Sequence, residues 1–158
     1  MKVVYGAGMQ YLCFLKRSAI LGLAKSVEDC FFLVQENTGR SPNFWRDAHR
    51  FEFSEVAKEI RALSNTIKHN ISYVQASRST SAAFLVKTCG YREGSHLDVL
   101  MLQDEGIFNI PNTISSMYCF LMSVVELYTG MRHAFLDIPP DKRDAAIREA
   151  LVPSILNL

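Results

Sequence analysis

The sequence has little net charge and no long uninterrupted hydrophobic run, and each absence excludes a class of protein. The formal net charge is +1, so the chain lacks the basic surface by which many proteins bind nucleic acid without sequence preference. Any contact with RNA is therefore expected to be local. The uncharged residues 106–125 are interrupted by asparagine, proline and serine, which favours a loop and a buried helix over a membrane span.

The cysteines also lack a pattern typical of a disulfide framework or a zinc site. No C-x-x-C pair is present, and the four cysteines are widely spaced and stand mostly among apolar residues. We interpret them as reduced thiols of the core. Reduced thiols, and an apolar N-terminus without a small-residue cleavage site, predict a cytoplasmic protein. We predict no cofactor. The cysteines are Cys13, Cys30, Cys89 and Cys119.

Hydrophobic periodicity predicts a mainly helical chain. Apolar residues recur at steps of three or four from about Met9 to Gln35, which indicates a long first helix that ends before Gly39. A second helix is expected from about Pro42 to His69 or Asn70, with Ser41 as its N-cap. Because only a short turn separates them, the two helices are predicted to be antiparallel.

The periodicity changes after Asn70. Residues 72–110 predict an irregular insertion, with room for a short hairpin formed by the segments 82–89 and 97–102. A wide apolar stripe from Pro111 to about Thr129 predicts a third, buried helix, and a short fourth helix is expected at about 141–151. The 158 residues are those of one domain. We therefore predict a single mainly α domain over residues 1–158, a bundle of two long antiparallel helices, two further helices and the insertion.

The stretch from Val56 to Tyr73 carries two stripes of opposite character. One is apolar and predicted to be buried, and it consists of Val56, Ile60, Leu63 and Ile67. The other lies roughly opposite on the same helix and is polar, so burial does not explain its spacing. It consists of Arg61, Asn65, Lys68 and His69. One interpretation is a solvated helix face, with Lys68 and His69 favourably placed near the negative end of the helix dipole.

A second charged flank of the same predicted helix contains one histidine and three glutamates. A di-metal bundle needs Glu-x-x-His on two helices, whereas here the histidine precedes the glutamates and no second copy exists. We predict no metal site. The flank consists of His49, Glu52, Glu55 and Glu59.

Asn65 and His69 form an Asn-x-x-x-His pattern near the end of a long helix, which resembles the HEPN family of helical domains from bacterial toxin-antitoxin and antiviral systems. In that family an arginine often directly precedes the asparagine, whereas this chain has Ser64 there. The nearest upstream arginine, Arg61, is separated from His69 by seven residues. The resemblance extends to the segments Lys68-His69-Asn70, Phe84-Leu85-Val86, Gly90-Tyr91 and Phe108-Asn109-Ile110-Pro111.

The resemblance implies metal-independent RNA cleavage in a cleft between the protomers of a homodimer. His69 would be the general acid or base at the ribose 2′-hydroxyl, and Arg61 would offset charge on the phosphorane. Asn65 would orient the phosphate or the imidazole. The residues expected to contact RNA are Lys68, Asn70, Arg132 and His133.

Two functions follow as hypotheses. One is a HEPN-like protein of bacterial stress or phage defence that acts on RNA as a ribonuclease, with the catalytic residues His69, Arg61 and Asn65. The alternative is a noncatalytic interaction module, such as an antitoxin or scaffold subunit, that binds a protein partner from the same defence system. No membrane association is predicted for either.

Overall fold

The chain folds into a bundle of helices. The computed structural model describes residues 2–103, 105–132, 137–139, 142 and 145–146. The helices are α1 (Lys2–Thr38), α2 (Ser54–His69), α3 (Thr80–Lys87), α4 (Leu97–Met101) and α5 (Ile110–Thr129), with two short 3-10 helices, η1 (Ala48–Arg50) and η2 (Gly106–Phe108). The only β-pairing among the described residues is one antiparallel bridge between Tyr73 and His96. The predicted mainly α bundle is confirmed.

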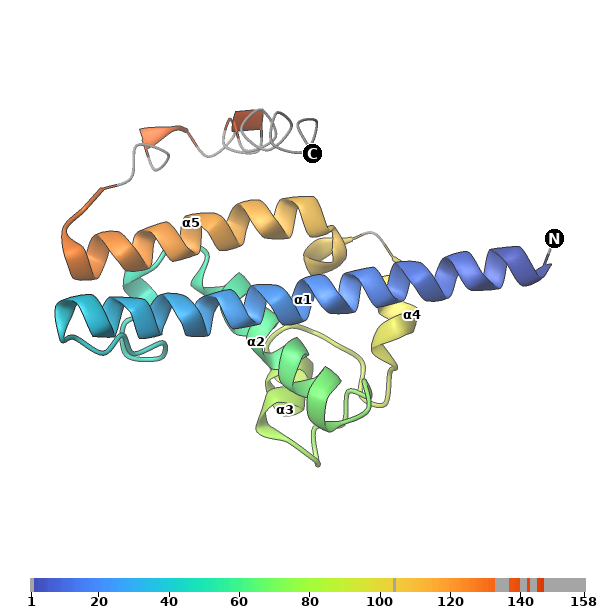
Figure 1. Ribbon diagram of the computed structural model, residues 1–158. Helices are drawn as coiled ribbons and strands as arrows, with labels where there is room; N and C mark the ends of the chain where they lie inside the picture. The colour runs from blue at the N-terminus through green and yellow to red at the C-terminus, as the bar shows by residue number, and fades with distance from the viewer. Residues whose placement is uncertain (1, 104, 133–136, 140–141, 143–144, 147–158) are drawn as a thin grey trace.

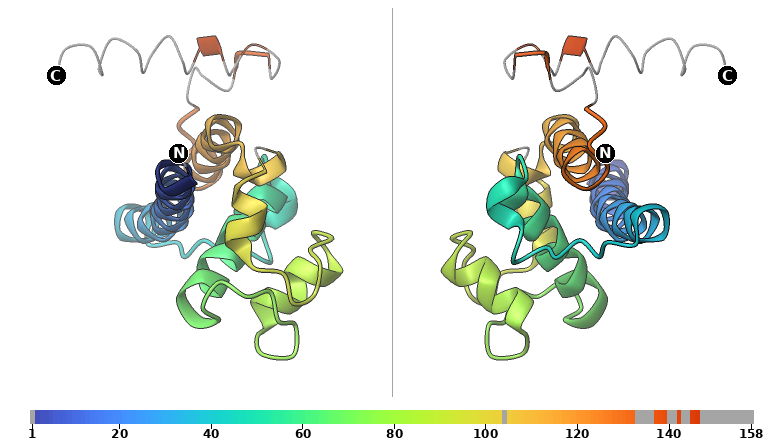
Figure 2. Two further views of the ribbon diagram at one scale, coloured as in Figure 1. Left: turned by 90° about the vertical axis from the view of Figure 1, so that its right-hand side faces the viewer. Right: turned by 90° about the vertical axis from the view of Figure 1, so that its left-hand side faces the viewer.

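The two longest helices, α1 and α5, lie side by side and run in the same direction (Figure 1). The chain between them returns to about the middle of α1, where α5 begins, and α2 crosses α1 at a steep angle on the way (Figures 1 and 2). The helix that lies along α1 is therefore α5, in a parallel arrangement, and not the second helix, for which an antiparallel arrangement was predicted. Helices α3 and α4 lie on the side of α1 away from α5, and the N-terminal turns of α1 extend beyond the rest of the bundle.

The core forms where α1, α2 and α5 meet. On α2, Ile60 and Leu63 are completely buried, and Val56 and Ile67 are partly buried against the same cluster. The predicted apolar stripe of this helix is thus confirmed. Each completely buried aliphatic side chain contributes roughly 1.5–3 kcal/mol to folding through the hydrophobic effect. The largest buried side chains contributed by α1 and α5 are Ile20, Met117, Phe120 and Val124.

The predicted start of the second helix was wrong, because residues 42–53 form turns and η1 before α2 begins at Ser54. The side-chain oxygen of Asn43 accepts hydrogen bonds from the backbone N–H groups of Trp45 and Arg46, at 3.1 and 2.8 Å. Asparagine and aspartate favour such turns because their side chains compete with the helical backbone for hydrogen bonds. Phe53 then adopts a left-handed φ of 52°, which separates this segment from α2.

The predicted hairpin within residues 72–110 was also wrong, because the two segments proposed as strands are α3 and α4. Short apolar runs are ambiguous between strand and helix, and N-capping favours the helix in both cases. The hydroxyl of Ser79 accepts from the backbone N–H of Ala82 at 3.0 Å. The Nδ1 of His96 accepts from the N–H of Asp98 at 3.2 Å.

The third predicted helix is confirmed as α5, and Gly130 ends it with a left-handed φ of 73°. The fourth predicted helix, at about 141–151, lies outside the described residues except for residues 142, 145 and 146. Among the helices of the described part of the chain, none combines the length and the apolar character needed to cross a membrane.

Helix α2 is followed by an exposed residue in a strained conformation. Ile71 has a φ of 49° and its surface is 81% exposed. The left-handed region is unfavourable for residues with a Cβ atom, especially branched ones, whereas asparagine tolerates it. We expect Ile71→Asn to raise the free energy of unfolding by about 1 kcal/mol, measured by urea denaturation. Ile71→Val keeps the branch and should produce no gain, and equal stability of all three proteins would contradict this account.

Candidate nucleotide-binding site on helix α2

The polar face of α2 is exposed at both ends and partly covered in the middle. Arg61, Lys68 and His69 are exposed, and Asn65 is half-buried. At 1.5 Å per residue, Arg61 and His69 are separated by about 12 Å along the helix axis. The structure thus places the predicted residues on an accessible surface, but at two different levels of the helix.

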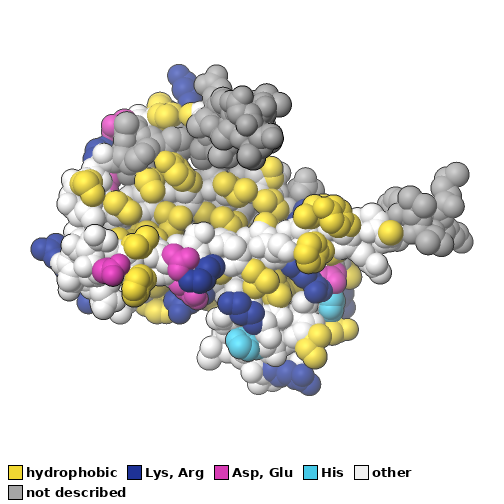
Figure 3. Space-filling view, viewed as in Figure 1, with side chains coloured by type: hydrophobic (Ala, Val, Ile, Leu, Met, Phe, Trp, Pro, Cys, Tyr) yellow, Lys and Arg dark blue, Asp and Glu magenta, His cyan; other side chains and the backbone are white. Residues whose placement is uncertain are grey.

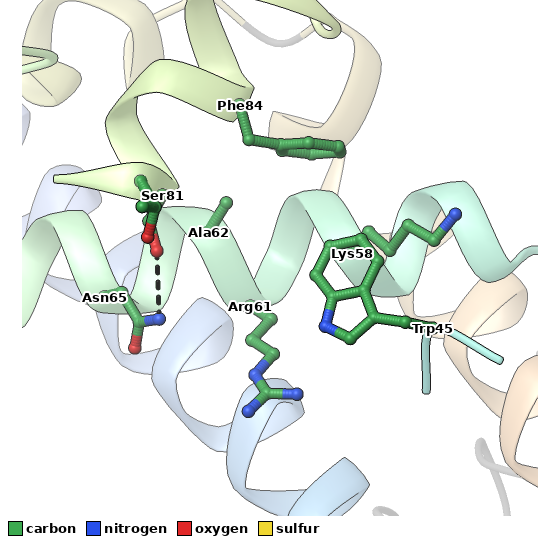
Figure 4. A pocket seen from close by; sticks show the side chains of 8 residues that line it. Trp45, Lys58, Arg61, Ala62, Asn65, Ser81 and Phe84 are labelled. Atoms are coloured by element: carbon green, nitrogen blue, oxygen red, sulfur yellow. Dashed lines mark hydrogen bonds between the residues drawn. The ribbon is translucent and has the colours of Figure 1, made fainter. Parts of the chain in front are cut away.

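Arg61 and Asn65 line one pocket, which lies between α2, α3 and the turn before η1 (Figure 4). Its volume is about 290 Å³, close to the lower limit for small-molecule sites. His69, Lys68 and Asn70 are not among its lining residues. The pocket is lined by Trp45, Lys58, Arg61, Ala62, Asn65, Thr80, Ser81 and Phe84.

Trp45 forms an aromatic wall of this pocket. Its ring meets Phe44 edge to face, with centroids 5.8 Å apart, and Phe84 in the same way at 6.4 Å. The Nζ atom of Lys58 lies 5.6 Å from the centroid of the indole, a distance at which a cation is attracted to the ring. Despite these contacts, 64% of the surface of Trp45 remains exposed.

The turn that carries Trp45 is held by the carboxylate of Asp47. This carboxylate accepts from the guanidinium of Arg46 at 3.0 and 2.9 Å, from the Tyr128 hydroxyl at 2.5 Å and from the Asn43 N–H at 3.1 Å. The bonds from Arg46 and Tyr128 hold the pKa of Asp47 well below its usual range. Since Tyr128 belongs to α5, this buried carboxylate fixes the turn to the core of the bundle.

The opposite side of the pocket is held by hydrogen bonds between α2 and the start of α3. The amide Nδ2 of Asn65 donates to the Ser81 hydroxyl at 3.1 Å, as the dashed line in Figure 4 shows. One turn further on, the Nδ2 of Asn70 donates to the Ser79 hydroxyl at 3.1 Å, and Asn70 is buried. The contact with Ser79 gives Asn70 a structural role in positioning α3.

Arg61 rests against the segment that precedes α2. Its guanidinium carbon lies 5.8 Å from the centroid of the Phe44 ring. Because Arg61 and His69 are about 12 Å apart along the helix axis, they do not share the pocket within one protomer. His69 is exposed at the last position of α2.

The remaining residues expected to contact RNA lie elsewhere. Arg132 follows α5 and forms ion pairs with Glu126 at 3.0 Å and Asp137 at 2.7 Å. His133 lies outside the described residues. In Figure 1 the end of α5 is at the end of the bundle where α1 also terminates, away from α3 and α4.

The glutamates of the charged flank are engaged in other contacts. Glu55 pairs with Lys58 at 2.5 Å, and Glu59 accepts from the Tyr91 hydroxyl at 2.6 Å. Burial raises the pKa of Glu59 above its usual value. In the part of the chain that the structure describes, no three histidine, cysteine or acidic side chains gather in a group that could hold a metal ion.

Comparisons with models of protein families, with curated proteins and with solved structures found no match. The pocket residues themselves therefore carry the functional inference. Sequence reasoning missed Trp45 and Phe84, because neither lies on α2: Trp45 comes from the turn before η1, which was predicted to be helical, and Phe84 comes from α3. Lys58 was detectable, since it stands three residues before Arg61 and so shares its helix face.

Proposed function

We propose that this chain is a HEPN-like protein of bacterial stress or phage defence that acts on RNA through the polar face of α2. One observation supports the proposal above all. Arg61, Lys68 and His69 are all exposed on α2, while the opposite face of the same helix is buried in the core. Cations beside an imidazole on an accessible surface suit the binding of a phosphodiester.

In the proposed reaction His69 acts as a general base and takes the proton of a ribose 2′-hydroxyl. The 2′-oxygen then attacks the adjacent phosphorus, and the bond from phosphorus to the 5′-oxygen breaks. The imidazolium returns the proton to the leaving 5′-oxygen, so the products are a 2′,3′-cyclic phosphate and a 5′-hydroxyl. Arg61 or Lys68 offsets the charge on the phosphorane, and no step requires a metal ion.

The separation of Arg61 from His69 leads us to place cleavage between two copies of the chain. Within one protomer the two residues lie about 12 Å apart along α2, and Arg61 leans toward Phe44. A symmetric dimer that brings two α2 faces together supplies His69 from one protomer and Arg61 from the other. The proposed ribonuclease is therefore a homodimer with composite sites.

The test is cleavage of single-stranded RNA by the purified full-length chain in the presence of EDTA. We expect cleavage by the wild type, and a loss of at least a hundredfold in His69→Ala and Arg61→Ala, because general acid–base catalysis and phosphorane stabilisation each contribute about that much. His49→Ala and Arg92→Ala are matched controls, since both side chains are exposed and lie outside the pocket. Equal cleavage by His69→Ala and wild type would refute the catalytic role.

The second candidate function is a noncatalytic interaction module, and it is favoured by the apolar surface of α1 and α5. Figure 3 shows hydrophobic side chains along α1 and between α1 and α5. A groove of about 500 Å³ lies there, with Cys30, Leu33, Leu121 and Val125 among its lining residues. Exposed apolar patches of this kind are typical of protein-binding surfaces. If the wild type neither binds nor cleaves RNA, this function replaces the first.

A further inference from the structure

The pocket at Trp45 combines three kinds of groups that single-stranded nucleic acid requires. It has an aromatic wall, formed by Trp45 and Phe84, and two cations, Lys58 and Arg61. It also has amide and hydroxyl groups, from Asn65, Thr80 and Ser81. Proteins that bind single strands stack bases on aromatic rings beside positive charges that hold the backbone.

The aromatic wall is fixed in place before any ligand arrives. Edge-to-face contacts with Phe44 and Phe84 hold the indole, and the Asp47 carboxylate holds the turn from which it projects. Most of the surface of Trp45 nevertheless remains exposed. A rigid ring with an accessible surface binds a flat ligand at a low cost in conformational entropy.

The two cations lie on the same side of α2, one turn apart. The described residues place no carboxylate in an ion pair with Arg61, whose guanidinium rests on the Phe44 ring. Lys58 is shared between the Trp45 ring and Glu55. An arginine that is positioned by an aromatic ring and forms no ion pair with a carboxylate can donate two hydrogen bonds to one phosphate.

We propose that this pocket binds one nucleotide of single-stranded RNA, with its base stacked on Trp45 and its phosphate held by Arg61 and Lys58. The inference rests on the proposed function and names its substrate as unpaired RNA. The volume of about 290 Å³ suits one base better than a duplex, and Asn65 and Ser81 supply groups that can pair with a base edge. An acidic peptide needs the cations but not the aromatic wall.

The chain contains a single tryptophan, so fluorescence excited where tryptophan but not tyrosine absorbs reports this pocket alone. The experiment titrates the full-length protein with a decamer of 2′-O-methyl oligoadenylate, which lacks the attacking 2′-hydroxyl, and follows tryptophan fluorescence. The same labelled decamer is followed by fluorescence anisotropy, which detects binding anywhere on the protein. We expect saturable quenching of Trp45 with a midpoint equal to that of the anisotropy curve.

Variants then assign the contacts. Trp45→Ala should weaken binding about fivefold or more in the anisotropy assay, since stacking of a base on an aromatic ring is worth about 1–3 kcal/mol, and each 1.4 kcal/mol is a factor of ten. Arg61→Ala should weaken binding and reduce the slope of log affinity against log salt by about 0.7, the value for one lost phosphate contact on a single strand. Arg92→Ala is the matched control and should bind as the wild type does. Circular dichroism confirms that each variant is folded.

The outcomes separate the inference from the proposed function. RNA binding by anisotropy with unchanged Trp45 fluorescence, and equal affinity in Trp45→Ala, would overturn the inference and leave the function standing. Absence of RNA binding in both assays would overturn the proposed function itself. Saturable quenching by a polyglutamate peptide but not by RNA would overturn the inference in favour of a protein ligand. Matching midpoints together with the two variant effects would support it.

Discussion

Phe120→Ala is expected to lower the free energy of unfolding by about 3–5 kcal/mol, the usual cost of removing a buried phenylalanine ring. Phe120 is completely buried on α5, at the centre of a cluster of phenylalanine rings. Its centroid lies 5.6 Å from Phe44, 5.6 Å from Phe51 and 6.4 Å from Phe31. Domains are typically stable by only about 5–15 kcal/mol, so this one change removes a large part of the total.

Urea denaturation followed by circular dichroism measures the effect. Phe32→Ala is the matched control, because Phe32 lies on α1 one residue after Phe31 but is 64% exposed. Its loss should change the free energy of unfolding by about 0.5 kcal/mol or less. Equal destabilisation by the two variants would contradict the packing of α1, α2 and α5 described above.

The loss of the Phe120 ring should also change the position of the side chains that line the pocket at Trp45. Phe44 contacts Phe120 on one side, and it supports both Trp45 and the guanidinium of Arg61. A cavity at position 120 removes the surface against which Phe44 packs. We therefore expect the tryptophan fluorescence of Phe120→Ala to shift toward that of a solvated indole while the protein is still folded.

Asp47→Ala is expected to lower the free energy of unfolding by about 2–3 kcal/mol at pH 7. The substitution removes a buried carboxylate that accepts from Arg46, Tyr128 and the N–H of Asn43, and hydrogen bonds to a charged group are worth about 1.5–3 kcal/mol. Asp29→Ala is the control, since Asp29 is an exposed carboxylate paired with Lys25. An exposed pair of this kind contributes at most about 1 kcal/mol.

The effect of Asp47 should depend on pH in a defined direction. Its pKa in the folded protein is lowered by the bonds from Arg46 and Tyr128, whereas in the unfolded chain it is about 3.9. The ionised carboxylate therefore stabilises the fold fully above about pH 4, and this stabilisation is lost as the pH falls below that value. Denaturation at pH 7 and pH 3 should show a smaller difference between wild type and Asp47→Ala at pH 3. A difference that grew on acidification would contradict this assignment.

The site now differs from the one that the resemblance implied. The resemblance grouped Arg61, Asn65 and His69 around one phosphate. The structure instead joins Arg61 and Asn65 to Trp45 and Phe84 in a pocket, with His69 at the end of the same helix. In the proposed arrangement the pocket anchors the strand, and His69 from a second copy acts on it. Arg61 then serves both to bind the nucleotide and to offset charge.

Local sequence patterns were sufficient to predict the helices that have a distinct apolar face. The apolar stripe of α2, the extent of α5 and its end at Gly130 followed from periodicity and from glycine's access to left-handed backbone. The segments 82–89 and 97–102 were misassigned because runs that short satisfy the apolar pattern of a strand and of a helix equally well. Their state depended on the capping groups of Ser79 and His96.

The sequence by itself determined that the chain is a mainly helical bundle and that one face of α2 is polar and solvated, because both properties repeat with the period of the helix. Only the tertiary structure decided which side chains from other segments lie against that face. Trp45 and Phe84 stand on either side of α2 in sequence and come from a turn and from α3. Trp45 and Phe84 are brought together by hydrogen bonds such as those from Tyr128 to Asp47 and from Asn65 to Ser81. The helical period does not predict these bonds, because each joins residues of different segments.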